Sequence, residues 1–417
     1  MRDIDDCRGK SDYELAEIIT AAVAMFLFKE GSRNAFNNDR EEGEFKANYE
    51  KLFKLKLPHM DTVDAVMRKL DEEELKNLKR SMIRTLLIGK VFHKYRFAGH
   101  WFIIAVDATG VVSYSERHCK NCLKTTSKKG KETFFHNVLE AKLICSNGFS
   151  VSLGTEWIEN PGENQGEDYD KQDCESKAFK RLAPKLKKDY PRLPICITAD
   201  GLYPNQHFLN ICRDNQWHYI LTFKEGNLPS VWKKVNKIKE LRKDNKNIEY
   251  NTRTMNIVVQ EYSRIEGINY CGHKFNYIEC IESDINFDKE KIKINTFVHI
   301  TDFEITQKNI VSISTAGRLR WKIENEGFNV QKNHGYKLQH KYSRASYQAS
   351  KNYYQCLQIA HMINQLVILS TKCSELLSGK ITVCHLWKNL IGFMVNNNLS
   401  RKILNSISKK RIQIRFG

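Results

Sequence analysis

The chain has 417 residues, 41 % of them hydrophobic, which is enough for roughly two or three domains with buried cores. Lysine and arginine number 67 against 49 aspartates and glutamates, so the formal net charge is +18. The apolar run 21–28 is too short for a membrane span of roughly 20 residues, and the 12 cysteines are scattered. These features argue against a membrane protein and against a disulfide-stabilised secreted protein.

The excess of positive charge is concentrated at the end of the chain. Residues 327–417 contain 14 lysines and arginines and one acid, Glu375, which gives a net charge of +13. A basic block of this size suits a polyanion such as DNA, and the alternative is a lysine-rich surface that only binds water. Nothing near the N-terminus resembles a secretion signal, so we expect a cytoplasmic protein with reduced thiols.

Residues 1–95 are expected to form a small helical domain. Helical spacing begins within residues 13–23, and the apolar run 21–28 predicts a buried helix. A second helix is expected to be capped by Asp61 and to continue through Ile83. This domain is a candidate for binding DNA ends, although no helix-turn-helix pattern is visible.

Residues 96–224 change to a strand-rich pattern. The apolar runs 101–107 and 194–200 are typical of strands buried on both faces, and they end in Asp107 and Asp200. The other elements expected here are strands 136–145, 149–157 and 218–224, helix 173–183 stopped by Pro184, and helix 205–213. The resulting order, three strands, helix, strand, helix, strand, is that of a ribonuclease H-like fold.

The remaining sequence predicts three further regions. Residues 225–310 contain alternating segments that indicate a β-rich insertion with one face exposed to water. A helix of the core within 311–345 carries Glu324, and residues 346–417 form a basic helical C-terminal region. We therefore expect an α/β fold: a ribonuclease H-like core interrupted by a β-rich insertion, with helical N-terminal and C-terminal regions.

Asp107, Asp200 and Glu324 form the candidate catalytic and metal-binding set. Two aspartates at strand ends and a glutamate on a neighbouring helix can hold two Mg²⁺ (or Mn²⁺) ions, the arrangement used to cut and join phosphodiester bonds. The alternative for Asp107 is a role in a turn over residues 107–110. Glu326 competes with Glu324, but on a helix the two point in roughly opposite directions, so only one can face the metals.

The residues around Glu324 resemble those of bacterial insertion-sequence transposases of the DDE class, in the group with a β-rich insertion before the glutamate. That group has a Tyr-two-Arg-three-Glu-six-Lys motif. Here Arg320 and Glu324 match the motif, whereas Gly317 occupies its tyrosine position and Gln331 its lysine position, with Lys332 one residue later. The strings HCKNCL, DKQDCE and RWKIENEGFNVQKNHGYKLQH resemble a subgroup, and the likeness spans roughly residues 95–365.

The resemblance implies a DNA transposase that cleaves strands at the ends of its element and transfers them into target DNA. The implied partners are double-stranded DNA, as terminal inverted repeats and as target, and a second copy of the chain in a DNA-bound homodimer, near the bacterial nucleoid. No membrane or nucleotide cofactor is expected, because no phosphate-binding glycine motif occurs. The residues expected to contact DNA are Arg318, Arg320, Trp321, Lys332 and Lys337, with Trp321 either stacking on a base or lying in the core.

Two alternative functions remain open at this level. One is a ribonuclease H-like nuclease that cuts DNA without strand transfer. The other is a DNA-binding derivative of a transposase with no catalytic activity, against which the presence of all three acids argues. Asp173 and Glu175 offer further acids, and Asp173 is expected to cap a helix.

A second candidate metal site is formed by cysteines and histidines. His118, Cys119, Cys122 and His136 have spacing compatible with tetrahedral zinc. The alternative is a loop of reduced thiols between the first two strands, since isolated Cys-x₂-Cys pairs also occur by chance.

Overall fold

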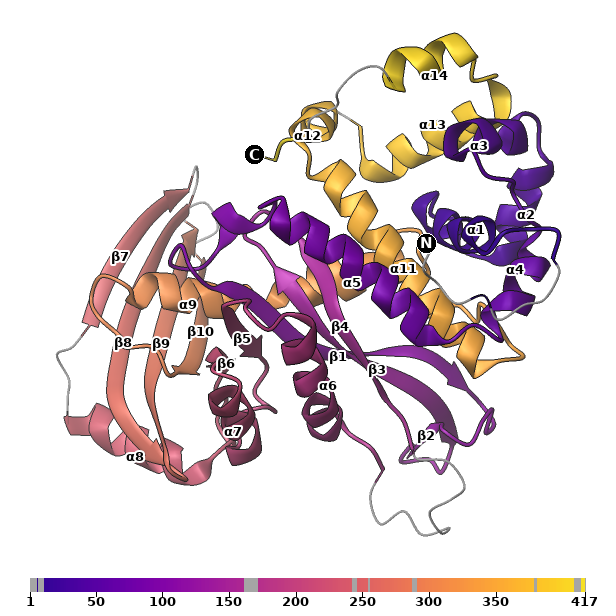
Figure 1. The fold of residues 1–417 in the computed structure, drawn as a ribbon. Coiled ribbons are helices and arrows are strands. Elements are labelled where there is room, and N and C mark those ends of the chain that lie inside the picture. The colour runs from indigo at the N-terminus through magenta and orange to yellow at the C-terminus, as the bar shows by residue number, and fades with distance from the viewer. Residues whose placement is uncertain are drawn as a thin grey trace.

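A computed structural model of the chain describes residue 6 and residues 11–160, 172–241, 246–253, 256–286, 291–378, 381–408 and 414–416. These residues form a mixed α/β structure with one large sheet flanked by helices (Figure 1). In this part of the chain, no helix is both long and apolar enough to cross a membrane.

The sheet has ten strands among the described residues, in the order β2-β3-β1-β5-β6-β10-β9-β8-β7, with β4 also paired to β3. Its centre combines antiparallel pairing of β1 with β3 and parallel pairing of β1 with β5 and of β5 with β6. The strands are β1 (Phe102–Tyr114), β2 (Leu123–Thr126), β3 (Glu132–Ile144), β4 (Ser150–Ile158), β5 (Ile195–Ala199), β6 (His218–Thr222), β7 (Lys246–Arg253), β8 (Asn256–Tyr270), β9 (His273–Asn286) and β10 (Lys291–Thr301).

Apolar side chains cover both faces of the central strands, which explains their continuous apolar runs. On one face, Ile104 and Val106 of β1 pack into a core shared with helices α6 (Glu175–Asp189) and α7 (Gln206–Asp214). On the other face, Ile103 and Ala105 pack with α9 (Ile310–Arg318) and with η2 (Ile323–Asn329), a π-helical segment. The expected burial of these strands on both faces is confirmed.

The helices at the two ends of the chain share one core. Helix α1 (Leu15–Leu27) is almost entirely buried against α11 (Tyr347–Ile368), and the two ends lie together in Figure 1. The apolar run 21–28 is therefore a buried helix, as expected. The other helices of this body are α2 (Arg33–Glu41), α3 (Phe45–Phe53), α4 (Met60–Met67), α5 (Glu72–Ile88), α12 (Thr371–Leu377), α13 (Val383–Asn396) and α14 (Arg401–Ser408).

The strands expected in the insertion extend the central sheet. β10 pairs antiparallel with β6, from His299 opposite Thr222 to Thr301 opposite Ile220, and β9, β8 and β7 follow in turn. Helix α8 (Pro229–Leu241) precedes them. The insertion is thus joined to the core by backbone hydrogen bonds, which hold β10 directly beside the parallel part of the sheet.

Two local predictions are wrong, and so is the alternative of a turn at Asp107. Helix α6 continues through Pro184 to Asp189, because Pro184 is exposed and the carbonyl that loses its donor can be hydrated. The helix expected from Asp61 to Ile83 is two helices, α4 and α5, capped by His59 and Asp71. Residues 107–110 form no turn, since β1 continues beyond Asp107 in its pairing with β3.

Short connecting helices complete the described fold. A single 3₁₀ turn, η1 (His93–Tyr95), joins α5 to the region before β1, and α10 (Val330–Asn333) follows directly after η2. Because η2 and α10 are contiguous, Lys332 lies on the same continuous run of helix as Glu324.

Candidate active site

Asp107 and Asp200 lie side by side at the carboxyl end of the parallel part of the sheet. The parallel pairing of β1 with β5 ends at Val106 opposite Ala199, and each aspartate is the next residue. Neighbouring strands are roughly 4.8 Å apart, so this register places the two backbones close together. Asp200 closes β5 as expected, whereas Asp107 lies within β1, at the point where the neighbouring strand ends.

Glu324 reaches Asp107 through a shared partner, Arg320. The Nη1 atom of Arg320 lies 2.7 Å from Oε1 of Glu324 and 3.5 Å from Oδ2 of Asp107. Arg320 is only 5 % exposed, whereas the Glu324 side chain is 40 % exposed. One buried guanidinium therefore holds a strand carboxylate and a helix carboxylate next to each other.

Burial of Asp107 changes its acidity. Desolvation raises the pKa of the Asp107 carboxyl from 3.8 to about 7, Arg320 opposes this shift, and Glu324 and Glu175 add to it by repulsion. The backbone N–H of Ala108 donates to the carboxylate at 2.9 Å. The group is therefore poised between its protonated and charged forms near neutral pH, as occurs where acids are gathered in a partly buried site.

Glu175 and Tyr203 join this cluster. The Tyr203 hydroxyl donates to Oε2 of Glu175 at 2.8 Å, and burial together with the charge of Asp200 raises the pKa of Glu175. Tyr203 is 3 % exposed, and this burial raises its pKa well above the usual value, with smaller contributions from the charges of Glu175, Asp107 and Asp200. Sequence reasoning missed Tyr203; its position three residues after Asp200 was the available signal.

Lys332 faces the same acids although it is one residue later than the lysine of the motif. Burial lowers its pKa, and the charges of Asp107 and Glu324 oppose that shift, so its ammonium group is close to both. Between them lies the π-helical segment η2, which uses more residues per turn than an α-helix. On an α-helix the seventh residue after Glu324, Gln331, would lie on the same face as Glu324. Because of the π-helical segment the eighth residue, Lys332, takes that position, and Gln331 is buried.

The glycine at the tyrosine position of the motif has a steric cause. A Cβ atom on Gly317 would lie 2.6 Å from the ring of His299 and 2.8 Å from Ile220. These residues belong to β10 and β6, against which α9 packs directly. No larger side chain fits at Gly317 without moving the helix away from the sheet.

The other residues expected to contact DNA have different surroundings. Arg318 pairs with Glu282 at 2.8 Å and stacks on the Phe297 ring at 3.9 Å. Trp321 is 49 % exposed, so the core alternative for it is wrong. Lys337 is exposed, and the stem of its side chain lies against Gly31 in the N-terminal helical body.

Glu326 points away from the acid cluster. It pairs with Lys322 at 2.7 Å and, with His361 and Gln365, lines a separate pocket beside α11. Of the two glutamates, only Glu324 shares a cation with Asp107. The geometry thus separates the two as expected for residues on opposite sides of a helix.

The ligand chemistry of Asp107, Asp200 and Glu324 suits a divalent cation of the Mg²⁺ type, but their carboxylate oxygens do not all lie within 4.8 Å of one another. All three offer carboxylate oxygens, which are the ligands that Mg²⁺ and Mn²⁺ prefer. Burial is the main cause of the raised pKa of Asp107, and repulsion from Glu324 and Glu175 adds to it, so a cation bound beside Asp107 would favour its charged form.

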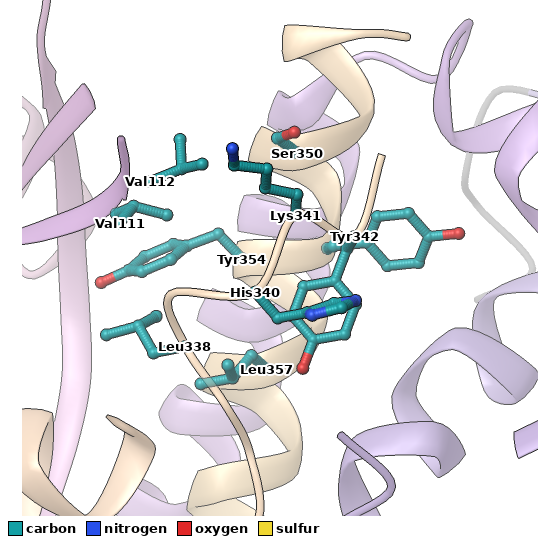
Figure 2. A pocket seen from close by; sticks show the side chains of 10 residues that line it. Val111, Val112, Leu338, His340, Lys341, Tyr342, Ser350, Tyr354 and Leu357 are labelled. Carbon is teal, nitrogen blue, oxygen red and sulfur yellow. The ribbon is translucent and has the colours of Figure 1, made fainter. Parts of the chain in front are cut away.

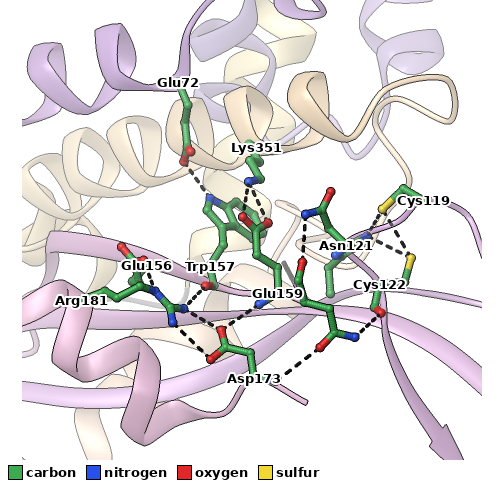
Figure 3. Close-up of polar contacts among 12 residues, drawn as sticks. Glu72, Cys119, Asn121, Cys122, Glu156, Trp157, Glu159, Asp173, Arg181 and Lys351 are labelled. Atoms are coloured by element: carbon green, nitrogen blue, oxygen red, sulfur yellow. Dashed lines mark hydrogen bonds and ion pairs between the residues drawn. The ribbon is translucent and has the colours of Figure 1, made fainter. Parts of the chain in front are cut away.

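Three of the four expected zinc ligands lie together. Cys119, Cys122 and His136 place their ligand atoms within 4.8 Å of one another (the two cysteines are seen in Figure 3). His118 does not belong to this group; its ring lies 4.2 Å from the ring of Tyr114. Asp173 does not cap α6, whose N-cap is Cys174, and pairs instead with Arg181 at 2.6 Å.

A small cavity lies between the later part of β1 and α11, away from the acids. It is lined by Val111, Val112, Leu338 and Leu357 among others, and Lys341 passes over it (Figure 2). Its volume of about 20 Å³ is close to that of a single water site. It is a packing void rather than a site for a substrate.

No protein-family model matches the chain, and no curated protein is significantly similar to it.

Proposed function

We propose that the protein is a DNA transposase, with Asp107, Asp200 and Glu324 as its catalytic acids. The observation that carries the proposal is the placement of the three acids: the strand register brings Asp107 and Asp200 to neighbouring positions on β1 and after β5, and Arg320 holds Glu324 beside Asp107. The sequence separates Asp107 from Glu324 by more than 200 residues, so their meeting does not follow from local structure.

The surroundings of the acids suit a large polyanionic substrate. The Glu324 side chain is 40 % exposed, Trp321 is half exposed beside it, and Lys332 adds a positive charge directed at the acids. The chain as a whole carries a net charge of +18. Lysine and arginine supply most phosphate contacts in DNA complexes, and exposed aromatic rings can stack on unpaired bases.

We propose that the core that carries these acids is ribonuclease H-like. The order β3-β1-β5-β6, with β1 antiparallel to β3 and parallel to β5, agrees with the strand arrangement expected for that fold. Strands β7 to β10 and α8 correspond to the β-rich insertion between Asp200 and Glu324. Fold alone does not define activity, so the acids and not the sheet are the basis of the proposal.

Divalent metal ions bound by the three carboxylates would activate the attacking oxygen and stabilise the leaving oxygen at phosphorus. Arg320 holds Glu324 and Asp107 at a fixed separation. Lys332 would neutralise part of the charge of a phosphate brought to these acids. Tyr203 orients Glu175, which lies close enough to Asp107 to affect its acidity.

The test uses a supercoiled plasmid that carries the DNA flanking the gene, including its inverted repeats. The full chain is expected to nick this DNA at the repeat ends in Mg²⁺ or Mn²⁺ and to join the freed 3′ ends to a target plasmid. Asp107→Asn, Asp200→Asn and Glu324→Gln should each abolish nicking and retain DNA binding, since binding depends mainly on lysine and arginine. Full nicking by Asp200→Asn would refute the assignment.

The two alternatives give different results in the same assay. Nicking at the repeat ends without joined products would identify a nuclease that lacks strand transfer. DNA binding without any metal-dependent nicking would identify a derivative that has lost catalysis. The ion pairs of Arg320 with Asp107 and Glu324 are the observation that favours the second alternative, because the guanidinium would compete with a metal ion for the same oxygens.

A further inference from the structure

The geometry points to a zinc site formed by Cys119, Cys122 and His136, separate from the acid cluster. Sγ of Cys119 and Sγ of Cys122 are 3.6 Å apart, and Nε2 of His136 is 3.3 Å from each. The three atoms therefore form a nearly regular triangle. They come from the loop before β2 and from β3, which are joined in sequence only through a hairpin.

The size of this triangle matches a tetrahedral zinc ion. Zinc lies about 2.3 Å from cysteine sulfur and about 2.0–2.1 Å from histidine nitrogen. At tetrahedral angles these bond lengths place two sulfurs about 3.8 Å apart and a sulfur and a nitrogen about 3.5 Å apart. The observed separations differ from these by only a few tenths of an ångström. A disulfide between the cysteines would instead need sulfurs about 2.05 Å apart.

The ligands are held in place by contacts that do not involve the metal. Asn160 Nδ2 donates to the carbonyl oxygen of Cys122 at 3.0 Å, and Asn121 Nδ2 donates to the carbonyl oxygen of Asn160 at 3.0 Å. His136 is fully buried, with its ring stacked on Tyr347 at 3.9 Å. Nδ1 of His136 has no hydrogen-bond partner among the described residues, so the imidazole is held by packing, whereas the loop is held by hydrogen bonds.

The fourth position of the metal lies on the exposed side of the group. Cys122 and His136 are buried, whereas Cys119 is partly exposed. Water can therefore complete the tetrahedron from the side of Cys119. His118 is exposed and lies against Tyr114, so three protein ligands and one water form the proposed site.

The zinc would connect the sheet to the start of α6. Asn160, which holds the Cys122 loop, accepts from the backbone N–H of Asp173 at 3.4 Å through its side-chain oxygen. Asp173 in turn accepts from Arg181 and from the backbone of Glu159 (Figure 3). Two residues later the chain reaches Glu175 of the acid cluster. The metal therefore supports one wall of that cluster without touching its acids.

The experiment measures zinc in the full chain, purified with zinc and without chelator, by elemental mass spectrometry. About one zinc per chain is expected, and Co²⁺ in its place should show the absorption of a tetrahedral thiolate complex. Cys119→Ser and Cys122→Ser should each lower the zinc content at least fivefold. Cys119 is partly exposed, so its variant tests the ligand even if the buried Cys122→Ser fails to fold.

Two matched controls should keep the metal. Cys174→Ser changes an exposed cysteine outside the group, and His118→Ala removes the neighbouring imidazole. Unfolding by heat should occur several degrees lower once zinc is removed from the wild type, with no such shift for Cys119→Ser. A zinc content of the wild-type protein below one fifth of an ion per chain would overturn the proposal. It is equally overturned if Cys119→Ser retains full zinc, or if the two cysteines are found as a disulfide.

Discussion

The buried Arg320 forms an ion pair with the partly exposed Glu324 one helical turn later, with Nη1 of the arginine 2.7 Å from Oε1 of the glutamate. The same nitrogen contacts Asp107, so the arginine is directed at acids of its own chain. This direction changes what a substitution of Arg320 is expected to do. A residue with 5 % exposure has little surface to offer a DNA phosphate.

Arg320→Gln should leave the salt dependence of DNA binding unchanged, because no phosphate contact is lost. Lys332→Ala is the comparison, because Lys332 is partly exposed near the acids and can contact a phosphate. Its loss should reduce the slope of log affinity against log salt by about 1. Binding isotherms at several salt concentrations measure both slopes. A slope reduced by Arg320→Gln would show that the guanidinium turns outward to DNA.

Glu324→Gln should abolish nicking, whereas Glu326→Gln should keep it within a fewfold of wild type. The reason is direction: Glu324 shares Arg320 with Asp107, and Glu326 pairs with Lys322 on the other side of η2. The two variants make the same chemical change two residues apart, so each is the control for the other. The reverse ranking in the nicking assay would move the site to the Glu326 side.

Asp107→Asn should stabilise the metal-free protein more at pH 8 than at pH 5, because most of the window between the two pKa values lies above pH 5. The folded-state pKa of about 7 is above the ordinary value of 3.8, so the folded protein binds more protons than the unfolded chain between these values. Ionisation of Asp107 in the unfolded chain therefore lowers the free energy of unfolding as the pH rises through this window, until the folded protein ionises as well near pH 7. Asparagine does not ionise and should recover about 1–3 kcal/mol above pH 7.

Thermal unfolding in EDTA at both pH values measures this difference. The midpoint of Asp107→Asn should exceed that of the wild type by a few degrees at pH 8. Asp173→Asn is the control, because Asp173 pairs with Arg181 and its replacement should destabilise the protein. Equal midpoints of Asp107→Asn and wild type at pH 8 would mean that Asp107 titrates at an ordinary pKa.

Tyr203→Phe should shift the pH dependence of nicking upward and lower stability by about 1 kcal/mol. The Tyr203 hydroxyl donates to Glu175 and thereby opposes the rise in the pKa of that carboxyl. Without the hydroxyl, Glu175 should stay protonated to higher pH. Nicking rates from pH 6 to pH 9 separate this effect from a simple loss of stability, which would lower the rate without moving the profile.

The sequence by itself determined which elements carry the acids. The apolar runs before Asp107 and Asp200 predict buried strands because a strand covered on both faces tolerates few polar residues, and both strands are present. The spacing from Arg320 to Glu324 places both on one helix face, and they do form a pair. Such properties depend on neighbours a few residues away, which a local pattern records.

Only the tertiary structure decided which distant groups meet. The extension of β1 beyond Asp107, the addition of β10 to β6 and the position of His136 beside two cysteines all depend on pairing between remote segments. The inward direction of Arg320 depends on the acid that β1 brings within reach. Lys332 faces the acids because a π-helical segment changes the number of residues per helical turn. The spacing of residues in the sequence does not reveal such a segment. Local sequence sets the burial pattern of each element, whereas ion pairs and metal ligands form between elements whose relative placement comes only with the folded core.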